Sequence, residues 1–209
     1  NIYTLKNEAE GEAYIYFDGN IRELPKKENG EINRFGPGLV ENDVDAFRHA
    51  YVSGRYTMEY SEKTANRLGL LNELTGNNSA GNQSDKNMDL WNNAIGREKG
   101  KKANTKEELY QLIHDALNNN ELIIDTNDLR KYKGETSYNI DLNRPVQVVQ
   151  ESRSGRNEYF IDFSNGNVMD SATFVSLIGS GEYPGYTISS KDTISTSMSK
   201  PDGSIENNL

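Results

Sequence analysis

Residues 42–60 read NDVDAFRHAYVSGRYTMEY and predict one amphipathic helix around which the rest of the chain is arranged. An α-helix advances about 100° per residue, so Phe47 and Tyr51 share one apolar stripe. Asp45 and His49 fall on another side, one turn apart, where an ordinary surface helix carries Lys and Glu. We therefore expect this helix to be buried on one side and to line a site on the other.

The spacing of Asp45, Arg48 and His49 points to acid–base chemistry. A carboxylate one helical turn before an imidazole fixes its tautomer and raises its basicity, as a general base requires. The guanidinium of Arg48 matches the geometry of a phosphate or an oxyanion. The same spacing also fits a buried polar helix face in which Asp45 satisfies His49 and nothing is catalysed. Taken alone, the pair favours this structural explanation.

A second predicted helix, MDLWNNAIGR (88–97), repeats the geometry. Asp89, Asn93 and Arg97 follow at i, i+4 and i+8 away from the apolar stripe, with Asn92 beside them. Two such helices can meet around a cleft, where Asp89 would be a second acid–base group or a ligand for a hard cation. Helix capping and a solvated polar surface are the alternative. When both helices are considered together, the catalytic and the structural explanations are about equally favoured.

Two further side chains, Glu73 and Tyr56, complete the candidates. Glu73, near the end of a predicted helix over 62–75, is a third carboxylate, although an exposed Glu is the default interpretation. Tyr56 and Asn92 are candidate substrate contacts. His114 lies opposite the apolar stripe of its own helix, so we expect it in solvent. With no Cys and one candidate His, a closed zinc site is disfavoured. The sequence indicates no cofactor, but Asp and Asn oxygens leave open a Ca²⁺ or Mg²⁺ site.

Bulk composition excludes several classes of protein. The 209 residues carry a net charge of -9, which disfavours a non-specific nucleic-acid binder because such binding needs a basic surface. No apolar run approaches the roughly 20 residues needed to span a bilayer. The P-loop, GxSxG, HExxH and GxGxxG motifs are absent from the sequence. The chain opens without Met or a signal peptide, and we interpret it as a piece of a longer protein.

The periodicity predicts an α+β fold with a mainly helical part, 1–143, and a small β-rich part, 144–209. Besides the two central helices, we expect helices over 4–17, 62–75 and 105–118, the last opened by the capping box Thr105-x-x-Glu108. A short strand is predicted over 121–125, and irregular chain over 18–41, 77–87 and 126–144. The β-rich part should contain a hairpin of 146–150 with 158–163, a short helix capped by Asp170 or Ser171, a strand near Ile188 and a surface tail from Ser189.

The blocks DAFRHAY (45–51), Asn72-Glu73 and MDLWNNAIGR (88–97) resemble uncharacterised C-terminal toxin domains of bacterial polymorphic-toxin proteins, of the Rhs, contact-dependent and secreted-effector kinds. Their pattern is D-A-x-R-H-x-x-W, then H-E, then D-L-x-N-N-x-x-G-R. The match covers about residues 40–100, and the C-terminal KPDGSIENNL resembles another small domain of unknown function. The chain departs from the pattern at Val52 and Asn72, where the family often has Trp and His. The resemblance implies functional roles for Asp45, Arg48, His49, Glu73, Asp89, Asn92, Asn93 and Arg97.

The resemblance further implies a protein that is secreted and delivered into a target cell, with a cognate immunity protein in the producing cell. We therefore expect an interbacterial toxin that is a hydrolase, with His49 as general base, Asp45 orienting it, and Arg48 and Arg97 binding an anionic group. A phosphate-containing lipid, a cell-wall precursor or RNA is the expected substrate class, with nucleic acid ranked lower because the surface is acidic. The competing hypothesis is a non-enzymatic binding or structural module whose polar helix faces form a core network.

Overall fold

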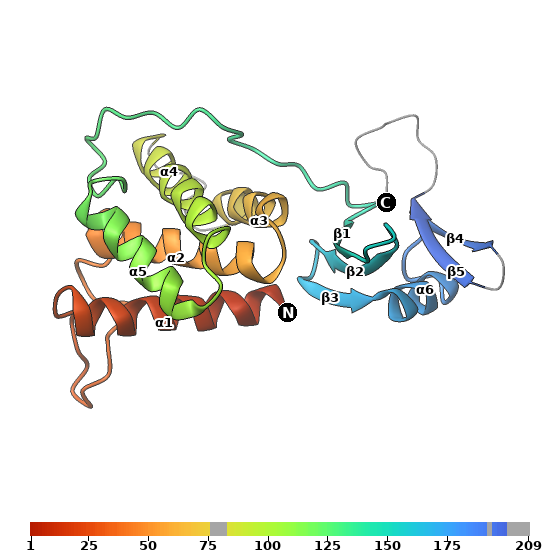
Figure 1. The fold of residues 1–209 in the computed structure, drawn as a ribbon, viewed down its shortest axis with the longest axis horizontal. Helices are drawn as coiled ribbons and strands as arrows, with labels where there is room; N and C mark the ends of the chain where they lie inside the picture. The colour runs from red at the N-terminus through yellow and green to blue at the C-terminus, as the bar shows by residue number, and fades with distance from the viewer. Residues whose placement is uncertain (76–82, 192–193, 200–209) are drawn as a thin grey trace. The chain divides into compact units, whose positions relative to one another are not determined.

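The computed structural model describes residues 1–75, 83–191 and 194–199, and it shows an α+β fold (Figure 1). Helices α1 to α5 precede the first strand, which begins at Val146, as the change of periodicity after Pro145 predicts. The elements are α1 (Ile2–Asn20), α2 (Asp43–Glu59), α3 (Glu62–Thr75), α4 (Gln83–Gly100), α5 (Lys106–Asn118), β1 (Val146–Glu151), β2 (Asn157–Asp162), β3 (Asn167–Asp170), α6 (Ser171–Gly179), β4 (Tyr186–Lys191) and β5 (Ile194–Ser199).

Two compact units make up the chain. The helical unit comprises residues 4–138, and the second unit comprises residues 1–3 and 139–209. Across the residues that the structure describes, no helix is both long enough and apolar enough to cross a membrane.

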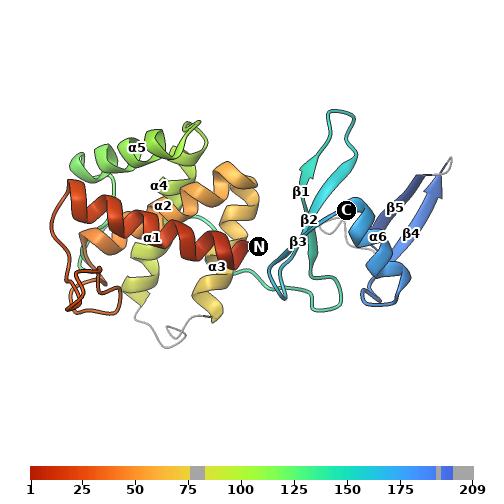
Figure 2. The same ribbon diagram turned by 90° about the horizontal axis from the view of Figure 1, so that it is seen from below.

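Helix α2 is the centre of the helical unit, because it packs against α1, α3, α4 and α5. Both ribbon views show α1 alongside α2 (Figures 1 and 2). Asn42 caps α2 by accepting a hydrogen bond from the Asp45 backbone N–H, which satisfies one of the free donors at the helix start. The predicted central helix is thus confirmed.

The contact between α2 and α4 is unusually close because glycines stand at the crossing. A Cβ atom on Gly96 would collide with the Ala50 backbone, and one on Gly100 would meet Gly54. With no side chain in between, the two backbones touch directly. This approach brings the polar sides of the two helices together.

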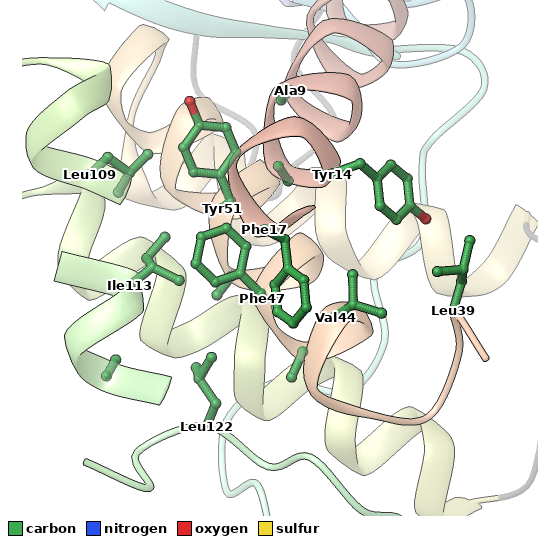
Figure 3. Packing of buried hydrophobic residues seen from close by; sticks show 14 of the residues in the cluster. Ala9, Tyr14, Phe17, Leu39, Val44, Phe47, Tyr51, Leu109, Ile113 and Leu122 are labelled. Atoms are coloured by element: carbon green, nitrogen blue, oxygen red, sulfur yellow. The ribbon is translucent and has the colours of Figure 1, made fainter. Parts of the chain in front are cut away.

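The apolar side of α2 enters a core rich in aromatic rings (Figure 3). Phe47 and Tyr51 are fully buried, and their ring centroids lie 6.4 Å apart with the two rings nearly parallel. Tyr110 of α5 stacks on Tyr51 at 4.5 Å, and Tyr16 of α1 stacks on Tyr110 at 4.4 Å. Stacked aromatic pairs add to area burial. This core fixes the orientation of α2 and hence the direction of its polar side.

The predicted strand over 121–125 is wrong. Leu122 and Ile123 are buried in the core, as their hydrophobicity requires, but their backbone joins no sheet. The Asn92 side chain instead donates to the Ile123 carbonyl at 2.8 Å and accepts from its N–H at 2.9 Å. One amide therefore satisfies the polar groups that a neighbouring strand would have satisfied.

Two helices extend beyond their predicted ends. Helix α4 begins at Gln83, inside the stretch predicted as loop, while residues 76–82 lie outside the described residues. Helix α1 runs from Ile2 to Asn20 despite Gly11, where the Arg34 side chain packs against the bare Cα. His114 is also not free in solvent, because it is half-buried and its Nδ1 lies 3.1 Å from the Tyr16 hydroxyl.

The second unit contains a three-stranded antiparallel sheet in the order β1-β2-β3. The hairpin of β1 with β2 is confirmed, and β3 was not predicted as a strand. Asp170 caps α6 by accepting from the Thr173 N–H, also as predicted. The unit has its own small core, formed by Val146, Phe160, Met169, Phe174 and Tyr186.

The surface tail predicted from Ser189 is wrong over the described residues. Strands β4 and β5 pair antiparallel from Tyr186↔Ser199 to Lys191↔Ile194. The alternation of Thr, Ile and Ser in this stretch suits a strand better than a tail, because β-branched residues favour pleated backbone. Residues 200–209 lie outside the described residues.

Candidate functional site

The site lies where the polar sides of α2 and α4 face each other. Asp45 and His49 are one turn apart on α2, and the His49 Nε2 lies 3.6 Å from the Asp45 Oδ1. From α4, the Asp89 Oδ1 lies 3.3 Å from the same nitrogen. Asn93, one turn further along α4, also acts on the imidazole and raises its pKa. The predicted meeting of His49 with Asp89 is therefore present in the structure.

Arg48 occupies the centre of this cluster. Its Nη2 lies 2.5 Å from the Asp45 Oδ1 and 3.0 Å from the His49 Nε2. A guanidinium only donates, so in this contact Nε2 accepts and the proton of the neutral imidazole is assigned to Nδ1. Two carboxylate oxygens, of Asp45 and Asp89, also lie 3.6 and 3.3 Å from Nε2. Their negative charge would stabilise a proton on that nitrogen.

Burial keeps His49 neutral. Desolvation and the neighbouring Arg48 charge lower the pKa of His49 to about 4, against the opposing effects of Asp45 and Asn93. Burial alone would raise the pKa of Asp45, but two positive charges hold that pKa below its usual value: His49, which is itself protonated at the low pH where Asp45 titrates, and Arg48. At neutral pH the cluster thus combines ionised Asp45 with an unprotonated imidazole.

The cluster retains access to solvent, because the side chains of His49 and Asp89 are each 11% exposed. By contrast, the Nε of Arg48 is buried without a hydrogen-bond partner among the described residues. A buried N–H without an acceptor is costly. The polar cluster is therefore mostly buried, has a small solvent-exposed surface, and leaves one hydrogen-bond donor of Arg48 without an acceptor among the described residues.

Helix α1 contributes a charged layer that the sequence analysis missed. Glu10 accepts from the Arg48 Nη1 at 3.2 Å, and Lys6 lies 3.6 Å from the same Glu10 oxygen. Tyr14 is buried one turn further on, and burial raises its pKa, with Arg48, Glu10 and Asp45 all acting on it. The regular spacing of Lys6, Glu10 and Tyr14 along α1 was the available signal, but it is equally typical of a solvated helix face.

Other predicted residues are engaged elsewhere. Asn92 is fully buried and holds the Ile123 backbone. Arg97 is buried and donates to the Tyr132 hydroxyl at 3.3 Å. Tyr56 is buried near the other end of α2. Glu73 belongs to α3, and its side chain lies outside the described residues.

Asp45, His49 and Asp89 have the composition of a metal site. One ligand atom from each lies within 4.8 Å of the others. An ion with bonds of roughly 2.0–2.2 Å would bring such atoms to about 3 Å from one another. Two carboxylates and a neutral imidazole suit a transition metal better than Ca²⁺. However, the Arg48 Nη2 already lies against Asp45 and His49, so an ion would have to displace that positive charge.

Comparison with known families adds a boundary but no activity. Residues 31–121, less than half of the 209-residue chain, match a family described as Domain of unknown function (DUF6973). Asp45, Arg48, His49, Asp89 and Asn93 all fall inside the matched region, whereas the α1 residues around them fall outside it. No curated protein and no solved structure matches the chain.

Proposed function

We propose that the helical unit is a hydrolase that acts on a phosphate-containing substrate, with His49 as its general base. The observation that supports this most directly is the contact of the neutral His49 Nε2 with two carboxylates and a guanidinium, in a cluster that solvent still reaches. Such a constellation can both accept a proton and hold an anion.

In the proposed reaction Arg48 turns from His49 to the substrate phosphate, and the freed Nε2 lone pair removes a proton from a water molecule. The water oxygen attacks the substrate, the bond to the leaving group breaks, and the imidazolium, stabilised meanwhile by Asp45 and Asp89, gives its proton to the leaving oxygen. Arg48 takes up the negative charge of the phosphate group. The positive charge of Arg48 lowers the pKa of His49. A substrate phosphate bound to Arg48 would offset that charge, so the pKa of His49 would rise and His49 would become a stronger base.

We further propose that the chain is a toxin or effector domain of a secreted bacterial protein, delivered into a target cell and opposed by an immunity protein. This proposal rests on the resemblance of DAFRHAY (45–51) and MDLWNNAIGR (88–97) to such domains. A pull-down from the native host checks it: recovery of a neighbour-encoded binding protein is expected, and recovery of none contradicts it.

The test of the hydrolase compares growth of bacteria that express the parent chain, His49→Ala or His114→Ala. His114 is the other histidine in the chain and lies outside the cluster, so it serves as the matched control. Growth arrest by the parent and by His114→Ala, but not by His49→Ala, is expected. Equal arrest by all three would remove His49 from the mechanism.

A structural polar core is the second candidate, because Arg48 already pairs with Asp45 and Glu10. Thermal melting of purified His49→Ala separates the two. Little change in melting temperature with lost toxicity supports catalysis, and a large drop supports the structural role. Adding a chelator to the parent tests the metal alternative: unchanged activity is expected because Arg48 supplies the positive charge.

A further inference from the structure

The connection between α1 and α2 forms a second candidate site. Residues 21–42 project from the helices as a loop (Figure 1), in which Lys26 and Ile32 form an antiparallel bridge around the turn at Gly30. Between this loop and α1 lies a cavity of about 420 Å³, within the range of small-molecule sites. Its lining consists of Ile15, Lys27, Glu31, Ile32, Arg34 and Phe35.

The apolar part of this lining is unusually exposed. The residues Phe35 and Ile15 are 97% and 66% exposed. Single exposed apolar residues are ordinary, but here two of them stand with Ile32 around one cavity. The lining can therefore hold an aliphatic chain.

The charged part of the lining favours an anion. Lys27 is paired with Glu31 at 3.3 Å, which leaves Arg34 as the available cation. The Arg34 side chain lies over Gly11 and makes no hydrogen bond or ion pair with any residue that the structure describes. An arginine beside an apolar cavity matches a ligand that carries both a phosphate and a hydrocarbon chain.

The cavity is electrostatically linked to the His49 cluster. Burial raises the pKa of the Tyr14 hydroxyl, and the charges of Arg48, Asp45 and Arg34 all act on that pKa.

We propose that this cavity binds one hydrocarbon chain of a phospholipid and that Arg34 contacts its phosphate. This inference rests on the proposed function and narrows its substrate class to a membrane lipid. RNA is the weaker candidate, because the chain as a whole carries a charge of -9 and a lipid presents a single phosphate where RNA presents many.

The binding test uses the full chain and three probes: a monomeric short-chain phosphatidylglycerol, inorganic phosphate, and a single-stranded oligoribonucleotide. Calorimetric titration should show binding of the short-chain lipid and much weaker binding of phosphate alone. Phe35→Asp should weaken lipid binding about tenfold, because it removes apolar contact area. The matched control is Leu129→Asp, which changes a residue that is 90% exposed and does not line the cavity.

The charge of the site is tested in the same way. Arg34→Glu should weaken lipid binding at least as much as Phe35→Asp, while Arg153→Glu, an exposed control in the second unit, should leave it unchanged. Co-sedimentation with vesicles of phosphatidylglycerol and phosphatidylcholine in equal parts should follow the same order. Binding of phosphate alone as tight as lipid, or binding of RNA that depends on Phe35 and Arg34 without lipid binding, would overturn the proposal.

Failure of this inference can be told from failure of the hydrolase. If lipid binds and both Phe35→Asp and Arg34→Glu weaken it, yet His49→Ala leaves toxicity intact, the cavity stands and the catalytic proposal falls. If toxicity depends on His49 but lipid does not bind, or binds equally to both cavity variants and their controls, the hydrolase stands and the lipid site falls.

Discussion

The two sides of α2 are both buried, yet they are held by opposite means. One side places Phe47 and Tyr51 in an aromatic stack where contact area and shape stabilise the fold. The other places Asp45, Arg48 and His49 in an ion cluster, where removing charges from water costs free energy that pairing offsets only in part. Burial alone therefore does not distinguish core from site. A core side and a site side differ in what could replace them. Hydrophobic residues of the same size would stabilise the fold as well as a buried ion cluster does, but they could not carry out its chemistry.

Phe47→Ala should have the largest effect on stability. Removing a fully buried aromatic side chain costs roughly 3–5 kcal/mol, because the neighbours cannot collapse into the space. Chemical denaturation would measure this loss. Activity per folded molecule should be retained at low temperature, and activity lost in a fully folded variant would mean that the aromatic side also shapes the site.

Gly96→Ala should lower both the stability of the fold and the activity of the site. The added methyl group would collide with the Ala50 backbone and push α4 from α2, at a cost of about 3 kcal/mol. Because the displacement separates His49 from Asp89, activity should fall further than stability explains. Gly19→Ala is the matched control, since nothing lies within 4 Å of its added methyl group.

Lowering the pH should destabilise the fold through His49. Its folded pKa of about 4 lies below the usual value near 6.5, so the unfolded chain binds the proton first. Stability is then fully present above about pH 6.5 and falls as the pH drops towards 4, by roughly 3 kcal/mol at most. The melting temperature should fall less steeply between pH 6.5 and 4 for His49→Gln than for the parent chain. Identical slopes would contradict burial of a neutral imidazole.

Ser53→Ala should have the smallest effect. The Ser53 hydroxyl is buried on the polar side of α2 with no hydrogen-bond partner among the described residues. Replacing an unsatisfied hydroxyl by a methyl group should be neutral or stabilise by about 1 kcal/mol. Unchanged activity would show that polarity on this side of α2 is not sufficient for a role in the site.

The pairing of His49 with Asp89 could be predicted from sequence because each helix carries its polar residues at helical spacing, and two such helices have few ways to bury their apolar sides. The contribution of α1 could not. Lys6 and Glu10 form an i, i+4 pair of the kind found on any exposed helix, and only the three-dimensional packing places Glu10 on Arg48.

Two other errors have a common cause. A short apolar run such as 121–125 has no period of its own, so its structure depends on what its backbone can bond to. The Asn92 side chain makes those hydrogen bonds, to the carbonyl and the N–H of Ile123. Asn92 is therefore occupied by the backbone, whereas the sequence suggested that it contacts a substrate. The strand predicted near Ile188 is present as β4, whereas β5 was missed because Ser and Thr are common in both tails and strands, and pairing decides between them.

The glycine crossing of α2 and α4 also bears on how a ligand could arrive. Where two main chains touch, neither helix can slide past the other through a change of rotamer, so the opposite wall of the site is immobile. Adjustment of the cluster to a ligand then falls to side chains such as Arg48 and Glu10, whose ion pair measures 3.2 Å, while the two helices stay in place.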